Sequence, residues 1–519
     1  MADLFAKKPL NTILSEAAET GEGSLRRALG PTNLITLGIG AIIGTGIFVL
    51  TGTAAANHAG PAIVLSFVLA AVACVFAGLC YAEFASMIPV AGSAYTYGYA
   101  TLGEIFAWII GWDLILEYAF GAATVASGWS GYVLSLLGDF GIRMSPALAG
   151  APGTPFVMYH GHWEKLSRVT KALDLEHIDS KALLANPATG MTSSFNLIGF
   201  LGIALVTIIL IIGIKESANF NSFIVIVKVA VLLVFLGIGA NYIFGHWSEA
   251  QANWTPFIPP NTGSYGNFGW SGIATAAGVI FFAYIGFDAV STAAQEAKNP
   301  KRDMPIGILG SLAICTVLYI LVGAVLTGLV KYSNLDVPDP IAIGIDTTGV
   351  RWGSLLVKIG AICGLSSTMV VMLLGQSRVF FSMSKDGLLP PVASKVHPRF
   401  RTPYISSIVV GIFVALIAGL VPIAVLGELV SIGTLLAFVI VCAGVWILRV
   451  KGTDVPRAFV TPWVPFTPIM GISVSLLMML SLGWETWARL IIWLIIGMVV
   501  YFTYGKKHSR VQLGASAGK

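Results

Sequence analysis

The residue in this sequence best placed to do chemistry is Lys228, a charged amine within the apolar stretch 219–244. Counted from residue 219 at about 1.5 Å per helical residue, its Cα lies roughly 14 Å into a hydrocarbon core about 30 Å thick. An ionisable group at that depth is costly and is typical of a proton or ion pathway. The alternative is a structural role, in which the amine caps backbone carbonyls of a neighbouring broken helix.

Two carboxylates, Glu117 and Asp288, are the other ionisable residues deep within apolar stretches. Burial disfavours the charged form of such a group, so each is a candidate to exchange a proton during a functional cycle. Both also have a structural alternative. Glu117 could hydrogen-bond to a neighbouring backbone, and Asp288 could cap the N-terminus of a half-helix.

Catalysis based on histidine or metal is not expected. By sequence, all seven histidines lie in loops or tails, without partners at catalytic or metal-ligand spacing. We therefore expect a protein that is not an enzyme, with no catalytic residue, no metal and no cofactor beyond a proton as coupling ion. A channel is also disfavoured, because the sequence shows no continuous polar lining or charged ring.

The elements that must position these groups are membrane helices. Hydrophobic residues make up 56% of the 519 residues, charged residues make up 11%, and the mean hydropathy is +0.84. So few charges could not cover a water-soluble protein of this size, and lipid is the expected solvent. The pattern predicts an all-α integral membrane protein with twelve transmembrane helices, near 33–55, 62–87, 104–136, 195–214, 219–244, 269–297, 306–330, 353–383, 404–421, 424–449, 463–482 and 487–504.

Lysine and arginine residues predict the orientation of these helices. They gather in the loops and tails on one side, whereas the other side carries few besides those of one long insert, 139–192. The side rich in lysine and arginine is the cytoplasmic one, so both termini are expected there. The net charge of +5 follows from this asymmetry and does not point to a nucleic-acid partner. We interpret the insert as an outer surface loop.

Two of the predicted helices carry interruptions. The first has glycines at 38, 40, 44 and 46. Each glycine costs roughly 1 kcal/mol in a helix, so the helix is expected to unwind at 44–46. The sixth has Gly286 followed by Asp288. Close helix packing is the alternative explanation for such glycines. However, helices 1 and 6 are corresponding members of two five-helix halves, and paired breaks of this kind indicate an inverted-repeat transporter.

The breaks predict what could bind there. A broken helix frees backbone N–H groups on one side and carbonyls on the other, with matching dipole charges. Freed N–H groups at Gly44, Thr45 and Gly46 suit a carboxylate. Freed carbonyls suit an ammonium group, and those expected are at Ile43, Phe282, Ala283 and Ile285. A site with both ends fits a zwitterionic α-amino acid.

Several motifs resemble the amino acid–polyamine–organocation (APC) superfamily, and in particular bacterial members of its cationic amino acid transporter branch. The resemblance covers nearly the whole chain except the insert. The motifs are residues 38–48, 80–85 with 89–95, 282–288, 299–305, and 377–378 with 385–390.

The resemblance implies a fold and roles for residues. The fold is a five-plus-five inverted repeat with discontinuous helices 1 and 6, and with helices 11 and 12 outside it. The substrate backbone would sit at the two breaks, and the aromatic ring of Phe282 would act as a gate. Lys228 falls where proton-coupled relatives place an amine in the position of a sodium ion. The expected domains are a cytoplasmic segment 1–32, a first repeat 33–244, a second repeat 269–450, and helices 11 and 12 with a cytoplasmic tail, 451–519.

We expect proton-coupled symport of small neutral L-amino acids such as alanine, in the bacterial inner membrane. Met372 on helix 8 stands where cation-transporting members have a small residue, and a flexible methionine fills the volume of a long side chain. The alternative is transport or exchange of arginine, lysine or ornithine, with Glu117 as the partner of the cation. The sequence leaves open the oligomeric state, any small accessory membrane subunit, and the role of the insert.

Overall fold

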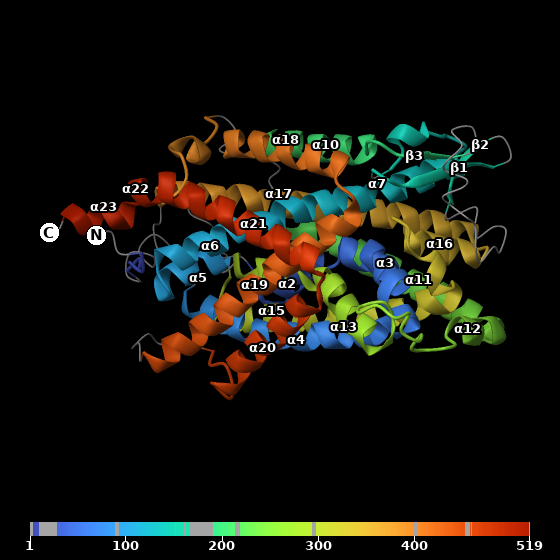
Figure 1. Ribbon diagram of the computed structural model, residues 1–519, viewed down its shortest axis with the longest axis horizontal. Helices are drawn as coiled ribbons and strands as arrows, with labels where there is room; N and C mark the ends of the chain where they lie inside the picture. Colours follow the sequence, from blue (N-terminus) through green and yellow to red (C-terminus); the bar gives the residue numbers. More distant parts are fainter. Residues whose placement is uncertain are drawn as a thin grey trace.

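The computed structural model describes residues 4–9, 29–88, 93–150, 152–159, 162–166, 190–212, 218–292, 297–398, 402–451, 457 and 459–517. Helices dominate these residues, and the expected all-α membrane fold is confirmed. The long helices run along one axis of the molecule (Figure 1). The C-terminal helix α23 (Arg510–Ala517) lies at one end, together with residues 4–9, and three short strands lie at the other.

The apolar helices match the predicted spans in position. Within the described residues, seven helices are long and apolar enough to cross a membrane and five apolar helices are shorter, so the count of twelve spans stays a prediction. The helices at these positions are α2 (Pro31–Ile42), α3 (Thr51–Ala54), α4 (Ile63–Met87), α6 (Glu104–Ile115), α7 (Gly121–Asp139), α10 (Leu197–Ile212), α11 (Ala218–Gly245), α13 (Gly269–Ile280), α14 (Ala289–Thr292), α15 (Pro300–Leu329), α17 (Arg351–Lys385), α18 (Tyr404–Leu420), α19 (Ile423–Val450), α20 (Phe466–Ser481) and α21 (Trp484–Val500).

Helices 1 and 6 are discontinuous, as predicted. In helix 1, α2 ends at Ile42 and the backbone of Ile43 (ψ 97°) leaves the helical region before a π-helical turn at Gly46–Leu50. In helix 6, α13 leads into a 3₁₀ turn at Phe281–Tyr284, and Gly286 then has a φ of +119°. Only glycine adopts that backbone conformation readily. Both breaks therefore free polar backbone groups that other residues must satisfy within the membrane.

The described part of the insert is not a simple surface loop, so that expectation is wrong there. It holds a three-stranded antiparallel sheet in the order β2–β1–β3, formed by β1 (Pro155–Tyr159), β2 (His162–Lys165) and β3 (Gly190–Thr192). Phe156 and Val157 of β1 are buried, which gives the strand an apolar anchor. Three short helices between the spans were also not predicted: α5 (Ser93–Thr101), α12 (Trp247–Asn253) and α16 (Pro340–Thr347).

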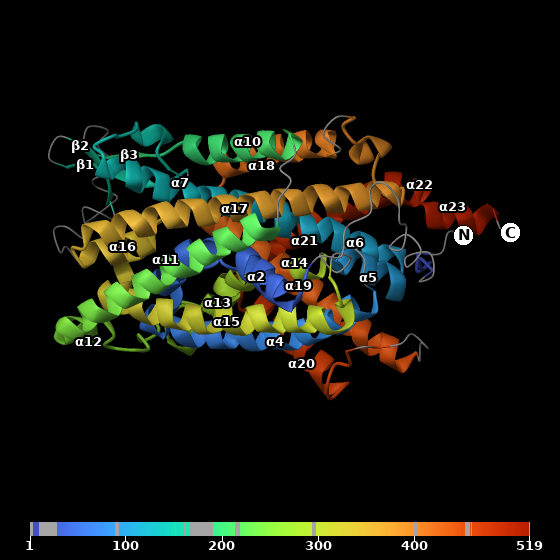
Figure 2. The ribbon, with the colours of Figure 1, turned by 180° about the vertical axis from the view of Figure 1, so that it is seen from behind.

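The N-terminal half of helix 1, α2, is enclosed by its neighbours. Helix α15 packs along both α2 and α4, and α11 packs against α2 from another side (Figure 2). As a result, side chains of α11 (helix 5) and α15 (helix 7) reach the point where α2 ends. The 3₁₀ turn of helix 6 is held in the same way, because α4 and α19 both pack against it.

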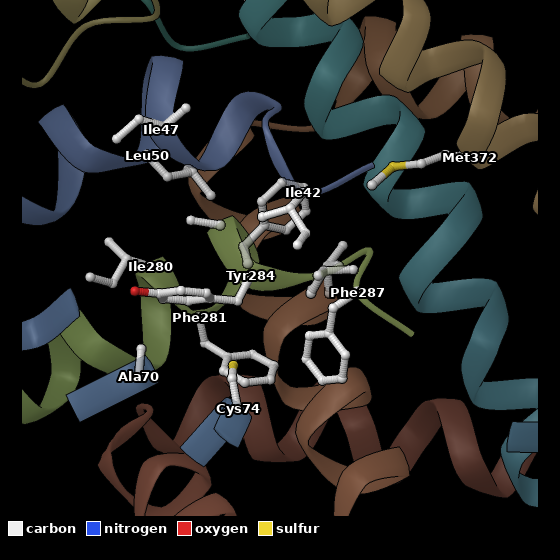
Figure 3. Close-up of a cluster of buried hydrophobic side chains, with 14 of the residues drawn as sticks. Ile42, Ile47, Leu50, Ala70, Cys74, Ile280, Phe281, Tyr284, Phe287 and Met372 are labelled. Carbon is white, nitrogen blue, oxygen red and sulfur yellow. The ribbon is translucent and has the colours of Figure 1, made fainter. Parts of the chain in front are cut away.

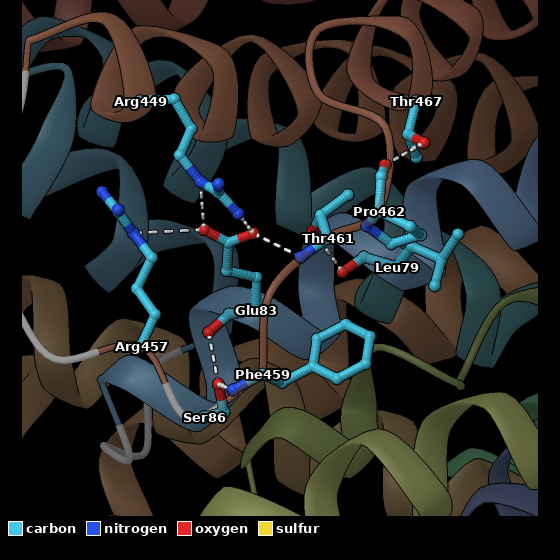
Figure 4. A network of polar contacts seen from close by, with 9 residues as sticks. All are labelled: Leu79, Glu83, Ser86, Arg449, Arg457, Phe459, Thr461, Pro462 and Thr467. Carbon is cyan, nitrogen blue, oxygen red and sulfur yellow. Dashed lines mark hydrogen bonds and ion pairs between the residues drawn. The ribbon is translucent and has the colours of Figure 1, made fainter.

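One buried ion pair ties α4 to α19. Glu83, of which 1% is exposed, accepts hydrogen bonds from Nε (3.0 Å) and Nη2 (2.8 Å) of Arg449 and from the amide of Thr461 (2.8 Å), as Figure 4 shows. Arg457 adds a second guanidinium 3.4 Å away. A two-point contact between arginine and carboxylate is strong and directional, so it fixes the two helices that support the helix 6 break.

Candidate functional site

The two helix breaks meet at the centre of the bundle. A Cβ atom built on Gly46 would lie 2.1 Å from Cα of Ala283, so helix 1 touches the backbone of helix 6 at this point. Apolar side chains of the two helices pack around the contact, among them Ile42, Phe281 and Tyr284 (Figure 3). The structure thus places the predicted residues of both breaks together, and their roles in binding stay predictions.

Lys228 joins helix 5 to the end of α2, the N-terminal half of helix 1. Its amine is fully buried and donates hydrogen bonds to the carbonyls of Gly40 (2.8 Å) and Ile43 (3.0 Å), and to Oγ1 of Thr368 on α17 (2.9 Å). Gly364 makes room for the lysine stem, since a Cβ atom there would lie 3.0 Å from Cγ of Lys228. The carbonyl-capping geometry is therefore present, while proton coupling stays a prediction.

The carbonyls freed at the end of α2 already have partners. Ile43 accepts hydrogen bonds from Lys228 and, at 3.4 Å, from Oγ1 of Thr368, and the hydroxyl of Tyr319 donates to the carbonyl of Ile42 (2.9 Å). The Thr368 hydroxyl has one proton, and the carbonyl of Gly364 is a nearer acceptor for it (3.2 Å), so Lys228 is the firm partner of Ile43. A substrate ammonium at Ile43 would have to share this carbonyl with Lys228.

The other residues predicted at the helix 1 break also face neighbouring helices. A Cβ atom on Gly44 would lie 3.1 Å from Cγ2 of Thr368, and one on Gly128 of helix 3 would lie 3.1 Å from Cγ2 of Thr45. In helix 6, the carbonyl of Phe282 accepts the amide of Ile285 at 3.2 Å. The Phe282 ring is buried, and its role as a gate stays a prediction.

The two predicted carboxylates lie together, which their spacing in the sequence did not reveal. Glu117 and Asp288 are both buried, and their carboxyl groups lie close enough to interact. Glu117 also accepts a hydrogen bond from Oγ1 of Thr434 on α19 (3.2 Å), and Asp288 accepts the amide of Gly286 (3.2 Å). Neighbouring carboxyl groups in other proteins can share one proton. Glu117 lies in a π-helical turn, Leu116–Phe120, that the sequence pattern did not indicate.

Sequence analysis missed a second buried lysine, Lys358, near the N-terminal end of α17. Its amine lies 2.7 Å from Oδ2 of Asp139, at the end of helix 3, and 3.1 Å from Oδ2 of Asp346 in α16. The lysine is 1% exposed, and the two aspartates are 42% and 40% exposed. The signal was present in the sequence, since residue 358 falls inside a predicted span, but its partners are distant in the chain.

A multi-pass helical membrane protein with two broken helices that meet at its centre has the architecture of a secondary transporter. The family model described as amino acid permease matches residues 29–504. The chain belongs to this amino acid permease family, so its resemblance to the APC superfamily is confirmed. Because members of the family are membrane transporters, the expectation that the protein is not an enzyme is also confirmed.

Individual relatives differ in what their names say they carry. The branched-chain amino acid permease BcaP of Bacillus subtilis is 45% identical, and the match covers 98% of this chain and 99% of the relative. The methylthioribose transporter of the same organism is 42% identical with the same coverage. A vacuolar cationic amino acid transporter of Arabidopsis thaliana is 29% identical over 94% of this chain and 93% of its own.

Proposed function

We propose that this chain is a proton-coupled symporter of small neutral L-amino acids such as alanine. We further propose that it resides in the bacterial inner membrane with both termini in the cytoplasm. The positive-inside rule supports the orientation. The two described terminal segments lie at one end of the molecule, where Lys8 pairs with Asp386 (2.9 Å) and the amide of Arg510 bonds the carbonyl of the same aspartate (3.0 Å).

The observation that carries the coupling proposal is the environment of Lys228. Its amine is fully buried and its three hydrogen-bond partners are neutral, so nothing in this set compensates its charge. These bonds join helix 1, helix 5 and helix 8. Loss of the proton would weaken the hold of the amine on the α2 carbonyls, which links protonation to the geometry of the break.

The proposed substrate class rests on the two breaks and on their apolar surroundings. Half-helix ends suit the carboxylate and ammonium of an amino acid. Met372 and Phe282 are both buried and give the side chain apolar neighbours. A relative that shares 45% of its residues with this chain is named for branched-chain amino acids, which are also neutral.

The second candidate is transport of cationic amino acids. Glu117 favours it, because a buried carboxylate that interacts with Asp288 of helix 6 could meet a cationic side chain. Several relatives carry that name, including the one from Arabidopsis. A third outcome is raised by the relative named for methylthioribose, a sugar without a carboxylate, whose uptake would contradict the assigned role of the helix 1 amides.

Uptake into proteoliposomes tests the proposal. The purified protein is reconstituted, and proton, sodium and counter-substrate gradients are imposed separately, with labelled alanine, leucine, arginine and methylthioribose as substrates. We expect alanine to be concentrated on an inward proton gradient alone and to be released by a protonophore. A strict need for sodium, or for internal amino acid, would overturn symport with protons. Uptake of arginine in preference to alanine would favour the second candidate.

A further inference from the structure

Helix 3 changes its geometry beside the two breaks. α6 ends at Ile115, the π-helical turn Leu116–Phe120 follows, and α7 begins at Gly121. A π-helical turn holds one extra residue, which rotates the following side chains by roughly 100°, and such turns gather at functional sites. Here the turn separates two directions. Glu117 contacts Thr434 of α19, whereas Gly121 faces α17.

Gly121 lies against two residues of the proposed side-chain region. A Cβ atom built on Gly121 would lie 2.9 Å from Sδ and 3.4 Å from Cε of Met372, and 4.0 Å from Cε2 of Phe282. Helices 3, 6 and 8 therefore meet at this glycine. The thioether end of Met372 occupies the space that any side chain at position 121 would need.

The kind of atom that Gly121 touches separates it from the packing glycines. An added Cβ on Gly46 would meet the backbone of Ala283, which cannot shift without moving helix 6. On Gly121 it would meet the mobile end of a methionine, which can turn to another rotamer. A side chain at position 121 should thus leave the fold intact and change only the space shared by Met372 and Phe282.

We propose that Gly121 is a specificity-determining residue that sets the upper size of the apolar side chain this transporter accepts. The absence of a side chain lets the Met372 thioether lie back against helix 3. The volume beside Phe282 then remains available to the substrate. This inference rests on the proposed function, in which a neutral amino acid binds at the two breaks with its side chain toward Met372.

The test is competition and uptake in proteoliposomes with Gly121→Ala. We expect kcat/KM for leucine relative to alanine to fall about tenfold or more, since one or two methylene-sized groups are discriminated by roughly 10- to 200-fold. The kcat/KM for alanine itself should stay within about threefold of the wild-type value. Adding Met372→Ala to Gly121→Ala should restore kcat/KM for leucine relative to alanine. Gly78→Ala is the matched control, because its added Cβ would have no neighbour closer than 3.6 Å and should leave the ratio unchanged.

The outcomes separate this inference from the proposed function. If wild type takes up alanine and leucine but Gly121→Ala keeps their ratio, the inference alone is wrong. An equal loss of both substrates, with a lower unfolding temperature, would show a packing role and also overturn it. If wild type takes up neither neutral amino acid, the proposed function fails and the inference fails with it.

Discussion

Two lysines are buried in the part of the chain that the structure describes, and their environments are opposite. Lys358, near the N-terminal end of α17, is paired with two carboxylates, those of Asp139 and Asp346. Lys228, beside the helix 1 break, donates only to two carbonyls and a hydroxyl. Both side chains are almost fully inaccessible, at 1% and 0% exposure. Burial therefore does not distinguish the two lysines. What distinguishes them is the charge of the groups that they bind.

The difference indicates which amine can change its protonation state during transport. Removing the proton from Lys358 would leave two carboxylates without their cation, so the pair holds the charge in place. Lys228 has no charged group among these partners, and its neutral form would leave only dipoles unsatisfied. We infer that Lys358 is a fixed clasp between helix 3, helix 8 and α16, and that Lys228 is the group able to respond to a proton gradient.

The largest effect is expected from adding a side chain at Gly46, where the helix 1 break touches helix 6. In Gly46→Ala the added methyl would lie 2.1 Å from Cα of Ala283, and one of the two half-helices would have to move. Overpacking of this kind costs about 1–3 kcal/mol or more. We expect complete loss of alanine uptake and a lower yield of monodisperse protein. Gly78→Ala serves as the control. Wild-type uptake by Gly46→Ala would show that the two breaks do not need this contact.

The next largest effect separates the two lysines directly. Lys228→Met should abolish concentration of alanine on a proton gradient while leaving exchange of internal for external alanine within about tenfold of wild type, because the substrate groups remain. Lys358→Met should still concentrate alanine. It should unfold at a somewhat lower temperature, since its aspartates are partly exposed and the pair contributes modestly.

A third variant controls for the loss of capping at the same break. Tyr319→Phe removes the hydroxyl that bonds the carbonyl of Ile42 and leaves the lysine in place. It should retain accumulation if charge, rather than capping, is what Lys228 supplies. Accumulation by Lys228→Met, or its loss in Lys358→Met, would reverse the assignment of the two lysines.

Features that follow local sequence rules were predictable. Apolar stretches marked the helices, and glycine spacing marked both breaks, since these depend on neighbouring residues alone. The position of Lys228 against helix 1 was one of two stated alternatives, because its depth in the membrane was readable from helix length. The partners of Lys228 were not readable, since Gly40 and Thr368 are 188 and 140 residues away from it.

Features that depend on contacts across the chain were missed. The clasp at Lys358 joins three elements that are separate in sequence, and the interaction between Glu117 and Asp288 joins two halves of the protein. The π-helical turn at Leu116–Phe120 was also invisible, because an extra residue in one turn leaves the apolar pattern almost unchanged. The small sheet in the insert lies in a segment with mixed composition, where no period indicated strands.

An intermediate effect is expected at the carboxylate pair. Asp288→Asn keeps an acceptor for the amide of Gly286 but cannot carry a negative charge or release a proton. If Asp288 takes part in coupling with Lys228, this variant should lose most proton-driven accumulation and keep exchange. Asp288→Ala should reduce both, because the hydrogen bond from the amide of Gly286 is lost as well, and such a bond is worth about 1 kcal/mol. Accumulation by Asp288→Asn at the wild-type level would leave Asp288 with a structural role only.

The smallest effect concerns a third cation, the charged side chain of a cationic substrate. An arginine side chain in the site would need what Lys358 has, a carboxylate partner, and Glu117 is the candidate. We expect Met372 to limit the room for that side chain, because its buried thioether lies beside Gly121 of helix 3. Met372→Ser should open that space and add a hydroxyl.

Discrimination by one or two methylene-sized groups is worth only about 1–3 kcal/mol, so Met372→Ser should shift preference rather than switch it. Competition of arginine and lysine against alanine uptake measures the shift, and we expect both to inhibit the variant more strongly than wild type. Glu117→Gln in that background should remove the gain, because the cation would again face a neutral group, as Lys228 does. If inhibition by arginine is unchanged in Met372→Ser, Met372 does not limit the site. Wild type that already prefers arginine would contradict the assignment more directly, since its cation would then be accommodated with the thioether in place.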